Sequence, residues 1–282
     1  MIWPNNAKFA FSFTFDVDID SFWRQKLISN GYNPEDPVVL SMGRYGANVG
    51  LNRILKLLEK YGIKATFFVP GEIAERYSSL IMEIKNQGHE IAHHGYEHLD
   101  LTSLSPERQI EEIVRGKRVL QEKIGITPVG FRSPGGINTN ILDALVNNGI
   151  IYDSSLMDDD KPYIYQFKNK EIVEIPWRYT IDDFVFYAFN YYPSLDYLKC
   201  HPINPRMLKE IWEDEFDTLY REGSFMTIIG HPHLIGQPSR TKALEEFIKY
   251  ILRKNDIWIT TYKEIAEYVK NNRNYFKNYV QD

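Results

Sequence analysis

The stretch that decides the fold is KFAFSFTFDVD, residues 8–18, which combines a strand with two acidic residues at its end. Phenylalanine stands at every second position from Phe9 to Phe15, an alternation typical of a β-strand. A segment with helical spacing of apolar residues follows at 49–61, and a second apolar strand at 63–69. These segments predict one β-α-β unit.

The alternation of strands and helices continues to the end of the chain. We expect strands at 89–93, 129–131, 150–153, 225–229 and 257–260, helices at 72–86, 106–123, 141–148, 207–221 and 242–254, and one last helix. The Gly-, Pro- and Asn-rich stretch up to about residue 48 indicates a long irregular connection. Repeated β-α units predict an α/β fold with a parallel sheet, and the length favours a barrel over an open sheet.

One segment interrupts this pattern. Residues 158–202 are rich in aromatic side chains, and we expect an insertion of short strands and loops over one end of the barrel. We find no repeat of fixed period, low-complexity tract or linker that would divide the chain. The sequence therefore predicts a single domain over 1–282, with a motif-bearing barrel at about 8–262.

Composition excludes some classes of partner. The chain has 33 Lys and Arg against 38 Asp and Glu, a formal charge of −5, and no basic run suited to nucleic acid. Cys200 is the only cysteine, so no intrachain disulfide can form. The amino terminus lacks the pattern of a signal peptide, and no apolar run reaches bilayer length. We expect a cytoplasmic protein that binds neither nucleic acid nor membrane.

Polar residues stand at the ends of five predicted strands. They are Asp16, His94, Arg132, Asp153 and His231. In a barrel of parallel strands these ends share one face, where active sites are built. The sequence therefore predicts a single site that is formed from distant parts of the chain.

Two short motifs predict a metal site. Asp16 and Asp18 lie on one side of an extended chain, which suggests a metal ligand beside a general base, although a solvated loop or helix cap would also explain the pair. His94 and His98 have the spacing that directs two imidazoles to one point on a helical turn, although such pairs are often structural. Together with Asp18 they form a set that suits Zn, Co, Ni or Fe(II) and leaves positions open for water and substrate.

Two further residues could complete such a site. The Arg132 guanidinium could pair with Asp16 and keep that carboxylate ionised, or could form a purely structural salt bridge. His231 follows a buried strand and could donate a proton to a departing amine, or could be a core histidine. His89 and His93 are expected in supporting or core positions.

These motifs, in this order, resemble those of the polysaccharide deacetylases, the family with the NodB homology domain, also called carbohydrate esterase family 4. The motifs are TFDVD at 14–18, residues 94–98, RSPGG at 132–136, a degenerate DSS at 153–155 and residues 228–231. The resemblance implies a distorted (β/α) barrel. It also implies a hydrolase that removes acetyl groups from N-acetylated sugars.

The resemblance carries roles over to individual positions. Asp18, His94 and His98 would bind Zn²⁺ or another divalent transition metal. Asp16 would be the general base, Arg132 would orient it, and His231 would be the general acid. The backbone N–H of Gly135 would stabilise the oxyanion, and Tyr152 and Asp153 are expected to contact the oxyanion or the substrate.

Some positions depart from the usual family pattern. Val17 separates the two acids, Gly95 replaces a Ser or Thr, and the fourth motif lacks its Trp. With GRYGA at 43–47 and HPHLIG at 231–236, these features resemble an intracellular branch of peptidoglycan-deacetylase-like proteins and cofactor-independent allantoinases. Members of this branch tend to form tetramers, so the resemblance implies a homo-oligomer in which residues 163–192 could supply an interface or a lid over the site.

Three functions therefore remain open from the sequence. The first is deacetylation of an N-acetylated glycan or a related small amide. The second is hydrolysis of a cyclic amide such as allantoin, and the third is a non-catalytic sugar-binding or scaffold protein.

Overall fold

The central element of the protein is a mostly parallel β-sheet. The computed structural model describes residues 3–189, 193 and 203–281. The sheet order is β10-β6-β7-β5-β4-β3-β2-β1-β8, with β9 also paired to β1, and within the described residues only β6 and β7 pair antiparallel. The strands are β1 (Phe9–Asp16), β2 (Thr66–Val69), β3 (Glu90–His93), β4 (Gly130–Phe131), β5 (Tyr152–Asp153), β6 (Tyr163–Phe167), β7 (Lys170–Glu174), β8 (Phe225–Gly230), β9 (Ile257–Ile259) and β10 (Asn278–Gln281).

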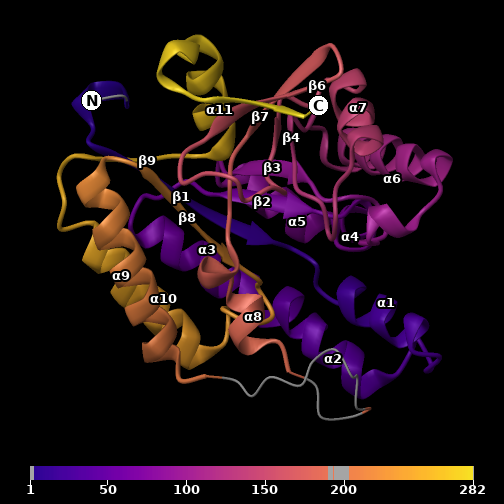
Figure 1. The fold of residues 1–282 in the computed structure, drawn as a ribbon. Helices are drawn as coiled ribbons and strands as arrows, with labels where there is room; N and C mark the ends of the chain where they lie inside the picture. Colours follow the sequence, from indigo (N-terminus) through magenta and orange to yellow (C-terminus); the bar gives the residue numbers. More distant parts are fainter. Residues whose placement is uncertain (1–2, 190–192, 194–202, 282) are drawn as a thin grey trace.

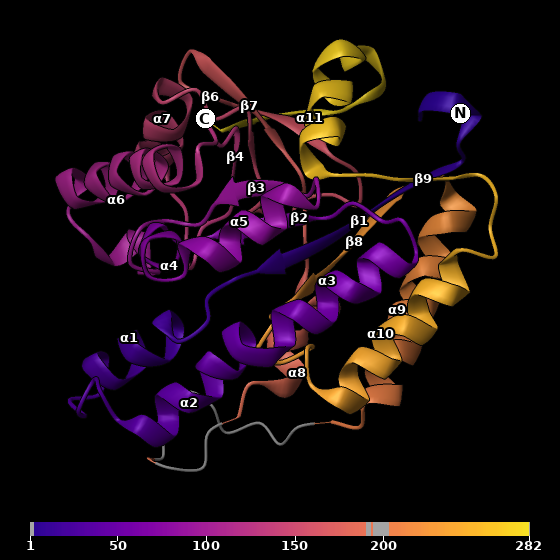
Figure 2. The same cartoon turned by 180° about the vertical axis from the view of Figure 1, so that it is seen from behind.

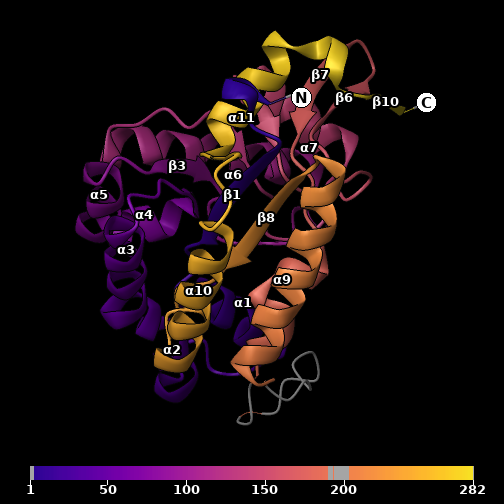
Figure 3. The ribbon, with the colours of Figure 1, turned by 90° about the vertical axis from the view of Figure 1, so that its left-hand side faces the viewer.

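Helices surround this sheet (Figure 1). Helices α9 and α10 run side by side along one flank, with α3 next to α10, as Figures 2 and 3 show. Both termini lie at the end of the molecule where α11 is, and α2 lies at the opposite end. The helices are α1 (Ser21–Ser29), α2 (Pro37–Tyr45), α3 (Leu51–Lys60), α4 (Gly71–Arg76), α5 (Ser78–Asn86), α6 (Pro106–Val119), α7 (Thr139–Asn147), α8 (Asp183–Tyr187), α9 (Pro205–Glu222), α10 (Pro238–Ile251) and α11 (Tyr262–Asn271).

The α/β fold class predicted from the sequence is confirmed. In the part of the chain that the structure describes, the first and last strands of the sheet are not paired with each other. An isolated parallel bridge between Asp182 and Ile229 brings the chain after β7 to β8. No closed ring of paired strands forms among the described residues, although this open path does not exclude a barrel. Within the same residues, no helix has the length and apolar character needed to span a bilayer.

Two expectations about segments require correction. The stretch before residue 48, which we expected to be an irregular connection, contains α1 and α2. The sequence did carry a signal for the start of α2. Asp36 caps the helix by accepting hydrogen bonds from Val38 N and Val39 N, and Pro37 is its first residue. Within 158–202, β6 and β7 join the main sheet, because β7 pairs parallel with β5. Residues 190–192 and 194–202 of that segment lie outside the described residues.

Alternate side chains of β1 face two different environments, an apolar core on one side of the strand and polar partners on the other. Phe9, Phe11, Phe13 and Phe15 are fully buried in one large apolar cluster, and Phe15 stacks on Phe67 with ring centroids 5.1 Å apart. The small side chains between them face the other way: Ser12, for example, donates to Thr260 O at 2.7 Å. This inner face leaves room for large polar groups from other strands.

A pair of buried carboxyl groups joins β5 to β7. Asp153 and Glu174 are paired in the sheet register, and both are fully buried. Burial raises the pKa of Asp153 to about 6 and that of Glu174 well above its ordinary value. No described N–H or O–H donor reaches Asp153 Oδ2 or Glu174 Oε2, so a proton on one oxygen supplies the donor for the other. The pair therefore retains a proton near neutral pH.

Replacing Glu174 with Gln should flatten the dependence of stability on alkaline pH. The pKa values of the pair are raised in the folded state, so the stability that the pair contributes is present at low pH and is lost as pH rises through the folded values. Thermal unfolding between about pH 5 and about pH 9 should show a steeper fall for wild type than for E174Q, at about 1.4 kcal/mol per unit of pKa shift. The exposed Glu210→Gln is the control; equal slopes for E174Q and wild type would contradict a shared proton.

Candidate metal centre

The carboxyl ends of neighbouring strands bring the predicted site together. Asp16 ends β1, His94 follows β3, Arg132 follows β4 and His231 follows β8. These side chains line one cavity of about 250 Å³ together with Asp18, His98, Gly135 and Asp182. Aromatic side chains form much of its remaining wall, namely Phe22, Trp177, Tyr179 and Phe184.

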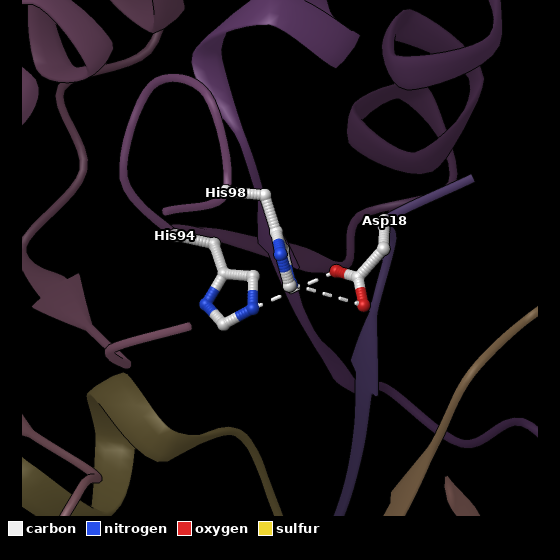
Figure 4. A group of neighbouring side chains, drawn as sticks. All are labelled: Asp18, His94 and His98. Carbon is white, nitrogen blue, oxygen red and sulfur yellow. Dashed lines mark ion pairs between the residues drawn. The ribbon is translucent and has the colours of Figure 1, made fainter. Parts of the chain in front are cut away.

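Asp18 forms close contacts with both His94 and His98 (Figure 4). Its carboxylate is 3.2 Å from His98 Nε2 and 3.6 Å from His94 Nε2, and all three residues are buried. Among the described residues, no hydrogen-bond donor reaches Asp18 Oδ1. A buried carboxylate oxygen without a donor is costly unless a cation compensates it. The donor set and this free oxygen therefore fit a divalent transition metal.

The orientation of His94 also suits a ligand. Its Nδ1 donates a hydrogen bond to the backbone carbonyl of Arg132 at 2.7 Å, which leaves the lone pair of Nε2 directed at Asp18. Burial lowers the pKa of His94 to about 4, so the ring is neutral at physiological pH. A neutral imidazole held in one tautomer is the form that binds a metal.

The chain reaches His98 through a loop and not through the helical turn that the spacing predicted. Gly95 and His98 both have positive φ, +72° and +56°, which turns the chain sharply after β3. The loop is fixed by Glu112 of α6, whose Oε2 accepts hydrogen bonds from Tyr96 N at 3.0 Å and Glu97 N at 2.9 Å. The two imidazoles therefore converge because α6 holds the loop.

Asp16 and Arg132 form the ion pair that the sequence predicted. Arg132 Nη1 donates to Asp16 Oδ1 at 2.6 Å, and the guanidinium lies 4.1 Å from the centre of the Phe68 ring. The other oxygen, Asp16 Oδ2, faces the cluster and lies 3.9 Å from His94 Nε2. Asp16 is thus held beside the candidate metal ligands by its partner from β4.

His231 is bracketed by carboxylates, including two that we did not predict from the sequence. Its Nδ1 donates to Asp183 Oδ1 at 2.7 Å, and its Nε2 lies 3.5 Å from Asp18 Oδ2. Burial disfavours the charged ring, but the hydrogen bond and charge of Asp183 raise the pKa of His231 to about 10. Asp182 and Asp183 lie at the start of α8. The one sequence feature that could have predicted their place in the site is that two acidic residues are adjacent.

Of the three residues expected to contact the oxyanion or the substrate, Gly135 lies at the cavity and Tyr152 and Asp153 do not. Gly135 lines the cavity, with its N–H 3.4 Å from Ser133 Oγ. Tyr152 and Asp153 are fully buried and do not line the cavity. Tyr152 donates to Glu90 Oε1 at 2.8 Å, and Asp153 is occupied by Ser155 and Glu174. Their position inside the sheet does not agree with contact to a substrate.

Sequence comparison relates this chain to deacetylases, in agreement with its α/β fold and with the residues of its cavity. The model of the family described as polysaccharide deacetylase matches residues 32–152. The peptidoglycan deacetylase of Helicobacter pylori is 28% identical, in an alignment that covers 90% of this chain and 94% of that protein. A peptidoglycan deacetylase-like protein of Gibberella zeae is 26% identical over 80% of this chain and 77% of its own length.

Solved structures give the same result. A Mycobacterium smegmatis protein assigned to the polysaccharide deacetylases superposes with a TM-score of 0.90 and 32% identity, over all of this chain and 96% of the other. PuuE allantoinase superposes with a TM-score of 0.81 and 26% identity, over 95% and 92% of the two chains. The chain belongs to the polysaccharide deacetylase family, hydrolases that act on carbon–nitrogen bonds other than peptide bonds. The family membership expected from the motifs is confirmed.

Replacing Glu112 with Gln should destabilise the loop that carries His98. A carboxamide accepts the two backbone N–H groups less strongly than a carboxylate, and hydrogen bonds to charged groups contribute about 1.5–3 kcal/mol each. We expect a loss of about 1–3 kcal/mol in the free energy of unfolding, measured by denaturant titration of the metal-free protein. The neighbouring exposed Glu111→Gln is the matched control, and an equal effect of the two substitutions would refute this role.

Proposed function

We propose that this protein is a metal-dependent hydrolase that removes acetyl groups from N-acetylated sugars. The proposal depends on one observation: three kinds of group line the same cavity. They are the buried carboxylate of Asp16, paired with Arg132, a histidine with a raised pKa, His231, and a candidate set of metal ligands, Asp18, His94 and His98. A base and an acid that flank a metal-binding set are what hydrolysis of an amide requires. Binding alone would require neither of them.

The side chains divide the reaction between them. A bound divalent ion, Zn²⁺ or a similar transition metal held by Asp18, His94 and His98, would acidify a water molecule and polarise the amide carbonyl. Asp16, held in place by its ion pair with Arg132, accepts a proton from the attacking water. His231 donates a proton to the amide nitrogen as the carbon–nitrogen bond breaks, which releases acetate and a free amine. The Gly135 N–H would donate to the oxyanion.

The substrate class is supported by the names of several relatives. The Helicobacter pylori relative is a peptidoglycan deacetylase, and a Bacillus cereus relative is a peptidoglycan-N-acetylglucosamine deacetylase that is 33% identical over 30% of this chain. Similarity to PuuE allantoinase favours a second candidate, the hydrolysis of a small cyclic amide, which a cavity of about 250 Å³ could also accommodate.

A direct assay separates the two candidates. Release of acetate from N-acetylglucosamine oligomers and ring opening of allantoin would be followed with added Zn²⁺ and with chelator. We expect acetate release that chelator abolishes and zinc restores. Ring opening without acetate release would favour the second candidate, and full activity of metal-free protein would exclude the proposed mechanism.

Asparagine substitutions at the two aspartates should separate metal binding from proton transfer. Asp18→Asn removes the charge from the candidate ligand set and should lower affinity for Zn²⁺ by about 100-fold or more. Asp16→Asn should retain the ion but lower kcat by about 100-fold or more, because the base is lost. Metal content by mass spectrometry and acetate release measure the two effects. Equal retention of metal and activity in both variants would contradict these assignments.

Replacing Asp183 with Asn should move the pH profile of hydrolysis. The hydrogen bond and charge of Asp183 raise the pKa of His231, and this histidine must be protonated in order to donate. Without that charge the pKa falls, so the alkaline limb of kcat/KM should move to lower pH by about one unit or more. An unchanged limb would show that the proton comes from another group.

A further inference from the structure

Asp182 is a carboxylate of the cavity that the proposed mechanism does not use. Its backbone forms the parallel bridge to Ile229, which fixes it close to the strand that leads to His231. Its Oδ1 accepts a hydrogen bond from Phe184 N at 2.9 Å and so caps α8. Its neighbour Asp183 is fully buried against His231, whereas Asp182 borders the cavity. The two consecutive acids therefore have different surroundings.

The second oxygen of Asp182 is available to a ligand. Among the described residues, no donor is bonded to Oδ2, and the side chain keeps 12% of its exposure. Burial raises the pKa of this carboxyl group to about 7, although the charge of His231 opposes the shift. A carboxylate that is short of donors in a partly desolvated site gains from a hydroxyl group of the substrate.

Among the described residues, the cavity offers no unpaired Arg or Lys side chain to an acidic substrate. In the part of the chain that the structure describes, Arg132 is the one Arg or Lys that lines the cavity. Its Nη1 is occupied by Asp16, and its Nη2 lies 3.2 Å from Ser154 Oγ. A carboxylate on the substrate would therefore find no unpaired positive side chain and would be repelled by Asp182.

We propose that Asp182 determines substrate specificity by accepting a hydrogen bond from the sugar hydroxyl next to the acetamido group. The inference rests on the proposed function, which places the acetamido nitrogen beside His231 Nε2, because Nδ1 of that ring is bonded to Asp183; Asp182 lines the same cavity as His231. In N-acetylglucosamine the neighbouring O3 is a hydroxyl and can donate. In N-acetylmuramic acid O3 carries a lactyl ether, which removes the donor and adds a carboxylate. The site thus selects the neutral sugar.

The test compares these two sugars, which differ only at O3. Binding to metal-free protein in the presence of chelator gives Kd, and acetate release by the Zn²⁺-loaded protein gives kcat and KM. We expect wild type to prefer the neutral sugar by about tenfold or more, and Asp182→Asn to reduce this preference by about fivefold or more, mainly through Kd and KM. Asp182→Ser retains a cap for α8 if the amide variant misfolds. The exposed Asp214→Asn, on α9, is the matched control.

The outcomes distinguish failure of the specificity role from failure of the proposed hydrolysis. An unchanged preference in both Asp182 variants, with acetate still released, would overturn the specificity role and leave the proposed function intact. Preferential binding that both variants lose, without acetate release by wild type, would support the role of Asp182 and overturn the hydrolysis. Absence of binding and turnover with either sugar would overturn both.

Discussion

The rest of the structure depends on the burial of one negative charge, the carboxylate of Asp18. It is 1% exposed and lies within 3.6 Å of nitrogen atoms from His94, His98 and His231. A charge removed from water must be compensated within the protein, or it destabilises the fold. The ends of four strands and the loop after β3 converge on this carboxylate, and this arrangement fits the proposed metal site.

The three imidazoles differ because their partners differ. His94 donates to a backbone carbonyl, and its lowered pKa keeps it neutral, the form that its proposed role as a metal ligand requires. His231 donates to Asp183, and its raised pKa keeps it protonated, the form that its proposed role as the acid requires. Burial lowers the pKa of His98, but the charge of Asp18 outweighs it and raises the net value, so an arriving metal ion competes with a proton there. Neighbouring groups thus give one residue type opposite protonation states.

Most of the fold and part of the site could be predicted from the sequence. The alternation of Phe in β1 reports a strand directly, and the Asp16–Arg132 contact followed from both residues standing at strand ends. The loop that carries His98 could not be predicted, because its path depends on Glu112 of a distant helix. Asp183 was missed because its role depends on a bridge between Asp182 and β8, which leaves no local pattern. Asp153 stands at a strand end but faces Glu174 inside the sheet.

The position of a bound metal ion tests the central claim most directly. A second cluster, formed by Asp182, Asp183 and His231, also has ligand atoms close together, so stoichiometry alone would not identify the site. A crystal structure of the zinc-loaded protein, with anomalous diffraction at the zinc edge, locates the ion. The account predicts one ion bound by Asp18 and by the Nε2 atoms of His94 and His98. An ion held by Asp182, Asp183 and His231, with Asp18 left without a metal, would contradict it.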